Sequence, residues 1–75
     1  MSGVKKRSVT IRGHRTSFSL EDAFVGELEE IAAARGMPLA ALVAEVDARR
    51  PRATNLSSAL RLFVLDQVKA AARRS

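Results

Sequence analysis

The alternation of apolar and polar residues near the N-terminus predicts one strand, over about residues 9–19. β-branched residues, which favour extended backbone, are frequent there. Successive side chains of a strand point to opposite sides. One set is suited to a core (Thr16, Phe18, Leu20), and the other is small, polar and basic (Arg15, Ser17, Ser19). The strand is therefore expected to have one buried face and one exposed face.

Gly13 interrupts this extended segment and leaves two ways to pair it. Gly13 and His14 could form the two-residue loop of a hairpin, because Gly in the first loop position suits a type II′ turn. Against this, an isolated two-stranded hairpin is marginal in water, and Gly-His is a weaker signal than Asn-Gly. Pairing of one strand between two chains is the favoured prediction, and the hairpin is the alternative.

The next apolar pattern predicts a helix over about residues 20–35. Phe24, Leu28 and Ile31 repeat at helical spacing, and Ser19 is available as a cap before the acidic first turn. Gly36 suits the left-handed position that follows a helix. A second helix is predicted over about residues 38–49, because Pro is tolerated in a first turn and Pro51 ends the segment.

A third helix is predicted over about residues 55–72, capped by Thr54 or Asn55. It has an apolar inner stripe, but Leu62 and Leu65 place apolar groups on other faces, which a monomeric surface helix avoids. A chain of 75 residues buries only roughly 60% of its unfolded surface, so a second subunit would supply missing core. The predicted dimer core comprises Phe18, Leu20, Phe24, Leu28, Ile31, Leu42, Val46, Leu60, Phe63 and Val64.

Charge is segregated along the chain, whose net charge is +5. Residues 1–15 hold five basic side chains and no acid, residues 16–48 hold seven acids and one base, and residues 49–75 hold seven bases and one acid. Basic ends around an acidic middle favour a polyanionic partner, although each basic run by itself could be a solvated tail.

Several classes of protein are disfavoured by the composition. Cysteine is absent, which excludes disulfide scaffolds and thiolate metal sites and agrees with a reducing cytoplasm. One histidine, His14, does not build a zinc site of usual composition. Glu27 and Glu30 read as solvated helix acids without a complementary nucleophile, so no enzyme and no cofactor are expected. No apolar run approaches the length of a membrane span.

The segments RTSFSLE, IAAARG and GMPL, followed by an apolar helix, resemble the ribbon-helix-helix (Arc/MetJ-like) superfamily, and in particular its short bacterial single-domain members. The resemblance covers Arg12–Val46 and, more loosely, the third helix. It implies a mainly helical, intertwined homodimer in which two chains pair one strand each into a ribbon that lies in the major groove of double-stranded DNA. Assembly beyond the dimer stays open.

The resemblance makes Arg15, Ser17 and Ser19 the expected base contacts. Arg15 can donate two parallel hydrogen bonds to guanine O6 and N7, whereas the serine hydroxyls suit several bases. Ser19 could instead serve only as a helix cap, and Ser17 could be merely a small exposed residue.

Phosphate contacts are expected from a flexible basic arm, residues 1–7, ahead of a single domain at residues 8–75. The arm and its neighbours supply Lys5, Lys6, Arg7, Arg12 and His14. A helix start with free N–H groups is a further anchor. Two starts qualify, at Pro38 and Leu39 or at Asn55 and Ser57, although Pro38 lacks an N–H and the second start could be an ordinary cap.

Together, these expectations predict that the protein is a cytoplasmic bacterial repressor that occupies an inverted-repeat operator. The alternative is a dimeric protein-interaction module, such as an antitoxin-like protein that binds a protein partner.

Overall fold

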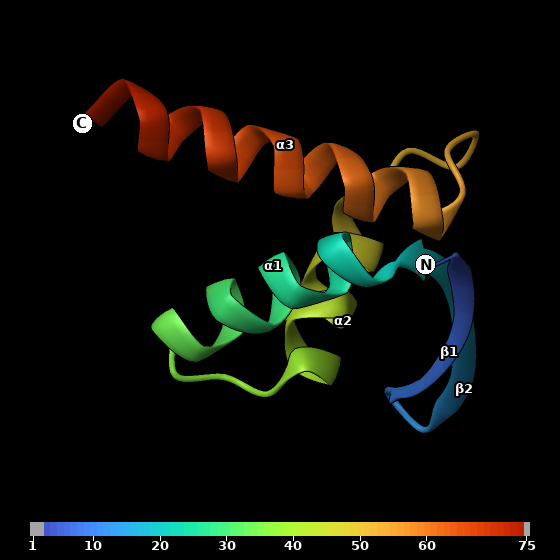
Figure 1. The fold of residues 1–75 in the computed structure, drawn as a ribbon. Coiled ribbons are helices and arrows are strands. Elements are labelled where there is room, and N and C mark those ends of the chain that lie inside the picture. Colours follow the sequence, from blue (N-terminus) through green and yellow to red (C-terminus); the bar gives the residue numbers. More distant parts are fainter. Residues whose placement is uncertain (1–2, 75) are drawn as a thin grey trace.

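The computed structural model describes residues 3–74, which form a hairpin followed by three helices (Figure 1). Strands β1 (Val4–Ile11) and β2 (His14–Glu21) make a two-stranded antiparallel sheet. Helices α1 (Asp22–Ala34), α2 (Leu39–Arg49) and α3 (Leu56–Arg74) follow. The three predicted helices are confirmed to within about two residues at each end.

The prediction of a single N-terminal strand is corrected, because the sheet has two strands and β2 pairs with β1 of the same chain. The loop is Arg12-Gly13, one residue earlier than the hairpin alternative placed it, and Ile11 lies opposite His14. Both loop residues have positive φ, 52° for Arg12 and 80° for Gly13, as a type I′ turn requires. Arginine rarely adopts this conformation, so Arg12-Gly13 is a weak sequence signal for such a turn.

The first half of β1 consists of charged residues, over which the sequence predicts a flexible arm instead of a strand. The structure places Val4–Arg7 in the strand and so corrects the flexible arm over that stretch; Met1 and Ser2 lie outside the described residues. Asp22 compensates two of the charges, since its carboxylate lies 3.6 Å from Lys5 Nζ and 3.7 Å from Arg7 Nη2. The negative charge of Asp22 at the start of α1 thus offsets part of the positive charge of β1.

The ends of the helices follow local hydrogen-bonding rules. Gly36, with φ 67°, follows α1, and its N–H donates to the Ala33 carbonyl while that of Met37 donates to Ala32, both at 3.0 Å. This is the Schellman pattern expected for a glycine after a helix. Ser19 does not cap α1, which is a correction: the cap position is Glu21 and has no side-chain cap bond.

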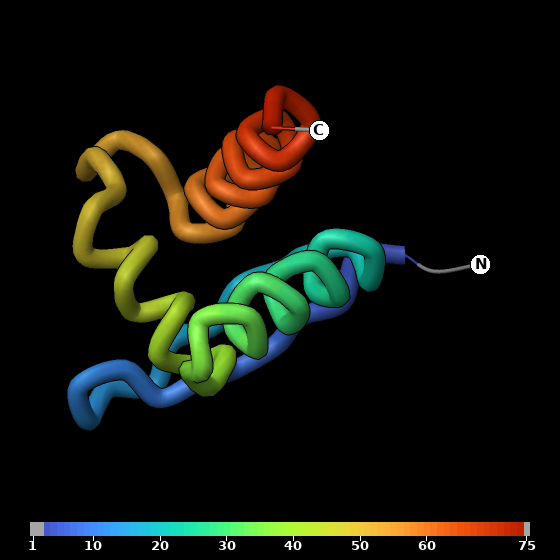
Figure 2. Tube along the Cα trace, turned by 90° about the vertical axis from the view of Figure 1, so that its left-hand side faces the viewer, coloured from blue at the N-terminus to red at the C-terminus, as the bar shows by residue number. Residues whose placement is uncertain are grey.

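The hairpin packs on the helices through one face. β1 contacts α2, while β2 contacts α1 and α3. Figures 1 and 2 show the hairpin along the side of the molecule where α1 begins, with α3 crossing on the opposite side of α1. Among the described residues, no helix is long and apolar enough to cross a membrane.

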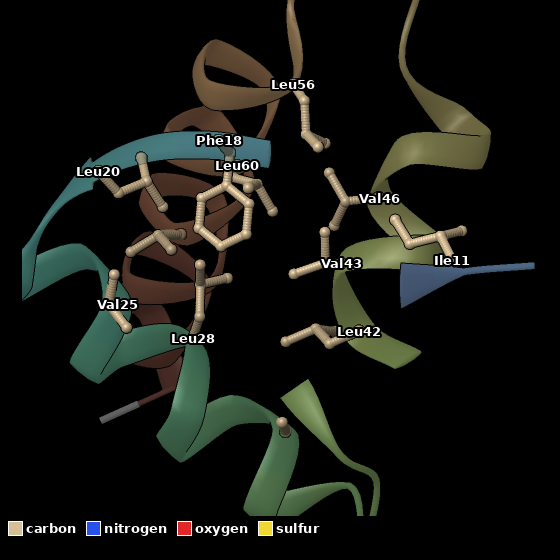
Figure 3. Close-up of a cluster of buried hydrophobic side chains, with 12 residues drawn as sticks. Ile11, Phe18, Leu20, Val25, Leu28, Leu42, Val43, Val46, Leu56 and Leu60 are labelled. Carbon is tan, nitrogen blue, oxygen red and sulfur yellow. The ribbon is translucent and has the colours of Figure 1, made fainter. Parts of the chain in front are cut away.

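Phe18 occupies the centre of the core, with its ring among Leu28, Val43 and Leu60 (Figure 3). Seven of the ten expected core residues are buried within the single chain, whereas Phe24, Ile31 and Phe63 are only partly buried. No polar or charged residue is buried in the described part of the chain. The full set of buried residues is Ile11, Phe18, Leu20, Val25, Leu28, Ala32, Leu42, Val43, Val46, Leu56, Leu60 and Val64.

Replacing Phe18 with Ala should lower the free energy of unfolding by about 3–5 kcal/mol, because the ring is removed from a packed core. Urea unfolding followed by circular dichroism measures this loss. Ser17→Ala, on the exposed face of the same strand, is the matched control and should stay within about 0.5 kcal/mol of the parent. Equal effects of the two variants would show that the faces of β2 are assigned the wrong way round.

Candidate nucleic-acid interface

The exposed face of the hairpin combines side chains of both strands. The register places Lys6 opposite Ser19, Ser8 opposite Ser17 and Thr10 opposite Arg15, and directly opposed residues point to the same side of a sheet. The structure thus brings the three expected base contacts together with Lys6, Ser8 and Thr10. We call these six residues the outer face. Five are exposed, and Ser19 is half-buried.

The outer face carries two cations and four hydroxyls and no acid. Lys6 and Arg15 lie toward opposite ends of the hairpin, with the hydroxyl groups of Ser8 and Ser17 between them and Thr10 directly opposite Arg15. Neither cation has an ion-pair partner among residues 3–74. Both charges are therefore available to an anionic ligand.

Sequence reasoning did not assign Ser8 and Thr10 to this site. Their small hydroxyl side chains stand at alternate positions, as those of Ser17 and Ser19 do, and this alternation was the one available signal. The sequence predicts residues 1–7 as an arm and residues 9–19 as one strand, and these elements do not place Ser8 and Thr10 opposite Ser17 and Arg15.

The start of α3 fastens the free edge of β2. The N–H of Ser19 donates to Ser57 Oγ at 2.9 Å, and Arg61 Nη2 donates to the Ser19 carbonyl at 3.4 Å. Arg61 also bonds Glu21 through its Nε, 3.2 Å from Oε1. Three contacts thus hold the hairpin at a fixed position on the helices.

The pKa of the Glu21 carboxyl group is lowered at this position. Its own backbone N–H bonds the carboxylate and lowers the pKa below the usual 4.5, and the hydrogen bond and positive charge of Arg61 lower it further. Partial desolvation opposes these effects without cancelling them. The carboxylate is thus kept ionised opposite Arg61.

The expected phosphate contacts are distributed over several places. Lys5 and Arg7 are paired with Asp22, whereas Lys6 belongs to the outer face. Arg12 is exposed in the turn, and His14 is exposed as the first residue of β2.

At the two helix starts, the residues expected to contact phosphate also have structural roles. Pro38 is the cap position of α2, where its carbonyl accepts from Ala41 and Leu42, and Leu39 packs against the core. Asn55 Oδ1 accepts from the Ser58 N–H at 2.8 Å, which is an ordinary helix cap. Ser57 is engaged with β2.

The loop between α2 and α3 adds further positive charge on the side where the hairpin lies (Figures 1 and 2). Arg50 is structural, because its Nε lies 2.6 Å from Asp47 Oδ1 and its Nη1 lies 2.7 Å from the Thr54 carbonyl. Arg49 and Arg52 are exposed and have no ion-pair partner in the described range.

Comparison with known families identifies the class. A family model described as the ribbon-helix-helix domain matches residues 4–68, from the first residue of β1 into α3. The chain belongs to the ribbon-helix-helix family, which confirms the resemblance seen in the sequence. Domains of this family are commonly DNA-binding regulators or antitoxins and are typically non-enzymatic. No curated protein and no solved structure gives a significant match.

Glu21→Gln should destabilise the protein in a pH-dependent way. Because the folded-state pKa lies below the unfolded value, the stabilisation from ionised Glu21 is complete above about pH 4.5 and is lost as the pH falls through the lowered pKa. Urea titrations between pH 3 and pH 7 should show parent and variant converging at the acidic end. A constant difference in unfolding free energy over this range would contradict the assignment.

Proposed function

We propose that this protein is a sequence-specific DNA-binding regulator of transcription that inserts its hairpin into the major groove. The observation that carries the proposal is the outer face, on which two strands of one chain present uncompensated cations and hydroxyl groups and no acid. Bound at an operator, such a protein hinders polymerase by occupancy and performs no chemistry. A bacterial cytoplasm is the setting that we propose for this repressor.

The dimensions of a hairpin suit this role. Neighbouring strands lie about 4.8 Å apart, and a two-stranded ribbon enters the major groove of B-DNA, which is about 12 Å wide. Within the groove, the Arg15 guanidinium can donate to guanine O6 and N7. The hydroxyls of Ser8, Thr10 and Ser17 can each donate or accept, and the Thr10 methyl can contact the thymine methyl.

Pairing within one chain changes what the ribbon recognises. A ribbon built from two identical strands is twofold symmetric, whereas β1 and β2 present different side chains. One hairpin therefore reads an asymmetric sequence. An inverted-repeat operator then requires two chains, each of which places one hairpin on one half-site.

Cations beside the hairpin would contact phosphates without reading sequence. Arg12 lies in the turn, Arg49 is the last residue of α2, and Arg52 lies in the α2–α3 loop. Each phosphate neutralised by such a side chain adds about 0.9 to the slope of log affinity against log salt. These residues supply affinity and orientation, while the outer face supplies specificity.

A second candidate function is a dimeric interaction module of the antitoxin type. The exposed apolar side chains of α3 favour it, since contiguous apolar surface marks protein contacts. The two functions differ in whether the outer face is needed for partner binding.

Selection of bound duplexes from a random DNA pool should enrich one sequence, and Arg15→Ala should bind it less tightly because a base contact is lost. The expected loss of discrimination between this duplex and a scrambled one is about 1–3 kcal/mol, measured by fluorescence anisotropy. Arg74→Ala, which removes the same charge at the far end of α3, is the matched control.

The control should weaken the selected and scrambled duplexes alike and only slightly. If Arg15→Ala behaved in the same way, Arg15 would not be a base contact. If no sequence were enriched by the parent protein, sequence-specific DNA binding would be rejected in favour of the interaction module.

A further inference from the structure

A cavity of about 270 Å³ lies between the C-terminal end of α2, the loop that follows it and the N-terminal half of α3. Its apolar lining includes Val46, which is buried, and Ala59 and Phe63, which are half-buried. No residue of the outer face lines it. An apolar cavity of about 150 Å³ holds a benzene molecule. The cavity beside α2 therefore has room for one aromatic ring or branched chain and a few further atoms.

Charged side chains also line this cavity, and two of them are already compensated within the chain. Glu45 Oε1 lies 3.5 Å from Arg35 Nη1. Arg50 Nε lies 2.6 Å from Asp47 Oδ1. These two side chains are held by their partners and do not need a ligand to balance their charge.

Two further charged side chains at the cavity, Arg49 and Asp66, are not compensated. Arg49 is the last residue of α2, Asp66 lies on α3, and both are exposed, so they stand where the cavity meets solvent. Neither has an ion-pair partner among residues 3–74, and they do not pair with each other. A ligand that carried a single charge would leave one of these two groups desolvated without a partner, which is unfavourable.

The Phe63 ring forms a preformed wall of the cavity. The guanidinium carbon of Arg35 lies 5.5 Å from the ring centroid, and Arg35 Nη2 donates to Gln67 Oε1 at 3.4 Å. These contacts hold the ring from one side before any ligand binds. A wall that is already ordered lowers the entropic cost of binding, and an aromatic or aliphatic group of a ligand can pack against it.

We infer that this cavity binds a free α-amino acid with an apolar side chain. The side chain of the ligand packs on Val46, Ala59 and Phe63, its carboxylate pairs with Arg49, and its ammonium group pairs with Asp66. Each of the two uncompensated charges thereby gains a partner, and such charge-assisted hydrogen bonds are the stronger ones. A residue within a peptide lacks at least one of the two charges, so a free amino acid fits the cavity better than a peptide.

The cavity is connected to the hairpin by a short segment. Thr54 in the loop lines the cavity, and Ser57 at the start of α3 accepts the hydrogen bond from the Ser19 N–H of β2. Binding of a ligand at the loop thus takes place close to the contact that holds β2. The inference nevertheless goes beyond the proposed function, because binding of an amino acid does not require DNA.

Titration of isotope-labelled protein with L-phenylalanine and L-leucine, followed by heteronuclear nuclear magnetic resonance without DNA, tests the site. At least one of the two should bind with a dissociation constant of about 1 mM or lower. The shifted amide signals should be concentrated in residues 45–54 and 59–66. Glycine, which lacks the apolar side chain, should not bind measurably. Absence of binding by both amino acids, or shifts concentrated elsewhere in the chain, would overturn the inference.

Compounds that lack one charge test the role of each charged side chain. Asp66→Asn should lower the affinity for the amino acid about tenfold but leave that for 3-phenylpropanoate, which has no ammonium group, unchanged. Arg49→Gln should also weaken the amino acid but leave 2-phenylethylamine, which has no carboxylate, unchanged. Glu30→Gln and Arg73→Gln remove exposed charges outside the cavity and are the matched controls.

Circular dichroism should show the same helix content in all four variants, since each replaced side chain is exposed. If Asp66→Asn and Arg49→Gln weakened every compound alike, or behaved like the controls, the assigned charge pairs would be wrong and the inference would be overturned.

The outcome is separable from that of the DNA-binding proposal. A protein that binds the amino acid but enriches no DNA sequence would reject the proposed function and leave the cavity assignment standing. A protein that enriches one DNA sequence but binds neither amino acid would support the proposed function and reject the cavity assignment.

Discussion

The insertion of Phe18 and Leu20 between the helices is the contact on which the rest of the structure depends. A two-stranded hairpin is marginal by itself in water, and it gains stability here because one face of β2 completes the core of the helices. The bonds from Ser57 and Arg61 to Ser19 then fix the free edge of β2. The core thereby determines which side chains of the hairpin face solvent.

The proposed function depends on this separation of a buried inner face and an exposed outer face of the hairpin. Because apolar residues hold the inner face against the helices, the outer face is presented on a supported sheet and not on a mobile loop. One chain thus carries the whole two-stranded element that we propose contacts DNA. The exposed apolar side chains of α3 lie on a different element from the outer face.

Much of the fold could be predicted from periodicity, and the parts that could not depend on contacts distant in sequence. The spacing of Leu28, Leu42 and Leu60 with their neighbours indicated three helices, and alternation placed Phe18 inside and Arg15 outside. The basic first half of β1 gave no such signal, because its pairing depends on Asp22 and on a turn with arginine at positive φ. For the same reason, the contribution of β1 to the outer face could not be predicted from the sequence.

Isotope-filtered nuclear Overhauser spectroscopy on an equal mixture of labelled and unlabelled chains tests most directly whether one chain forms the whole ribbon. In a hairpin with a two-residue loop, Ser8 and Ser17 form a pair without mutual hydrogen bonds, with Cα atoms about 4.5 Å apart, which gives a strong contact between their Hα protons. The account predicts this contact only within a chain. A contact between a labelled and an unlabelled chain would contradict it and show a ribbon shared by two chains.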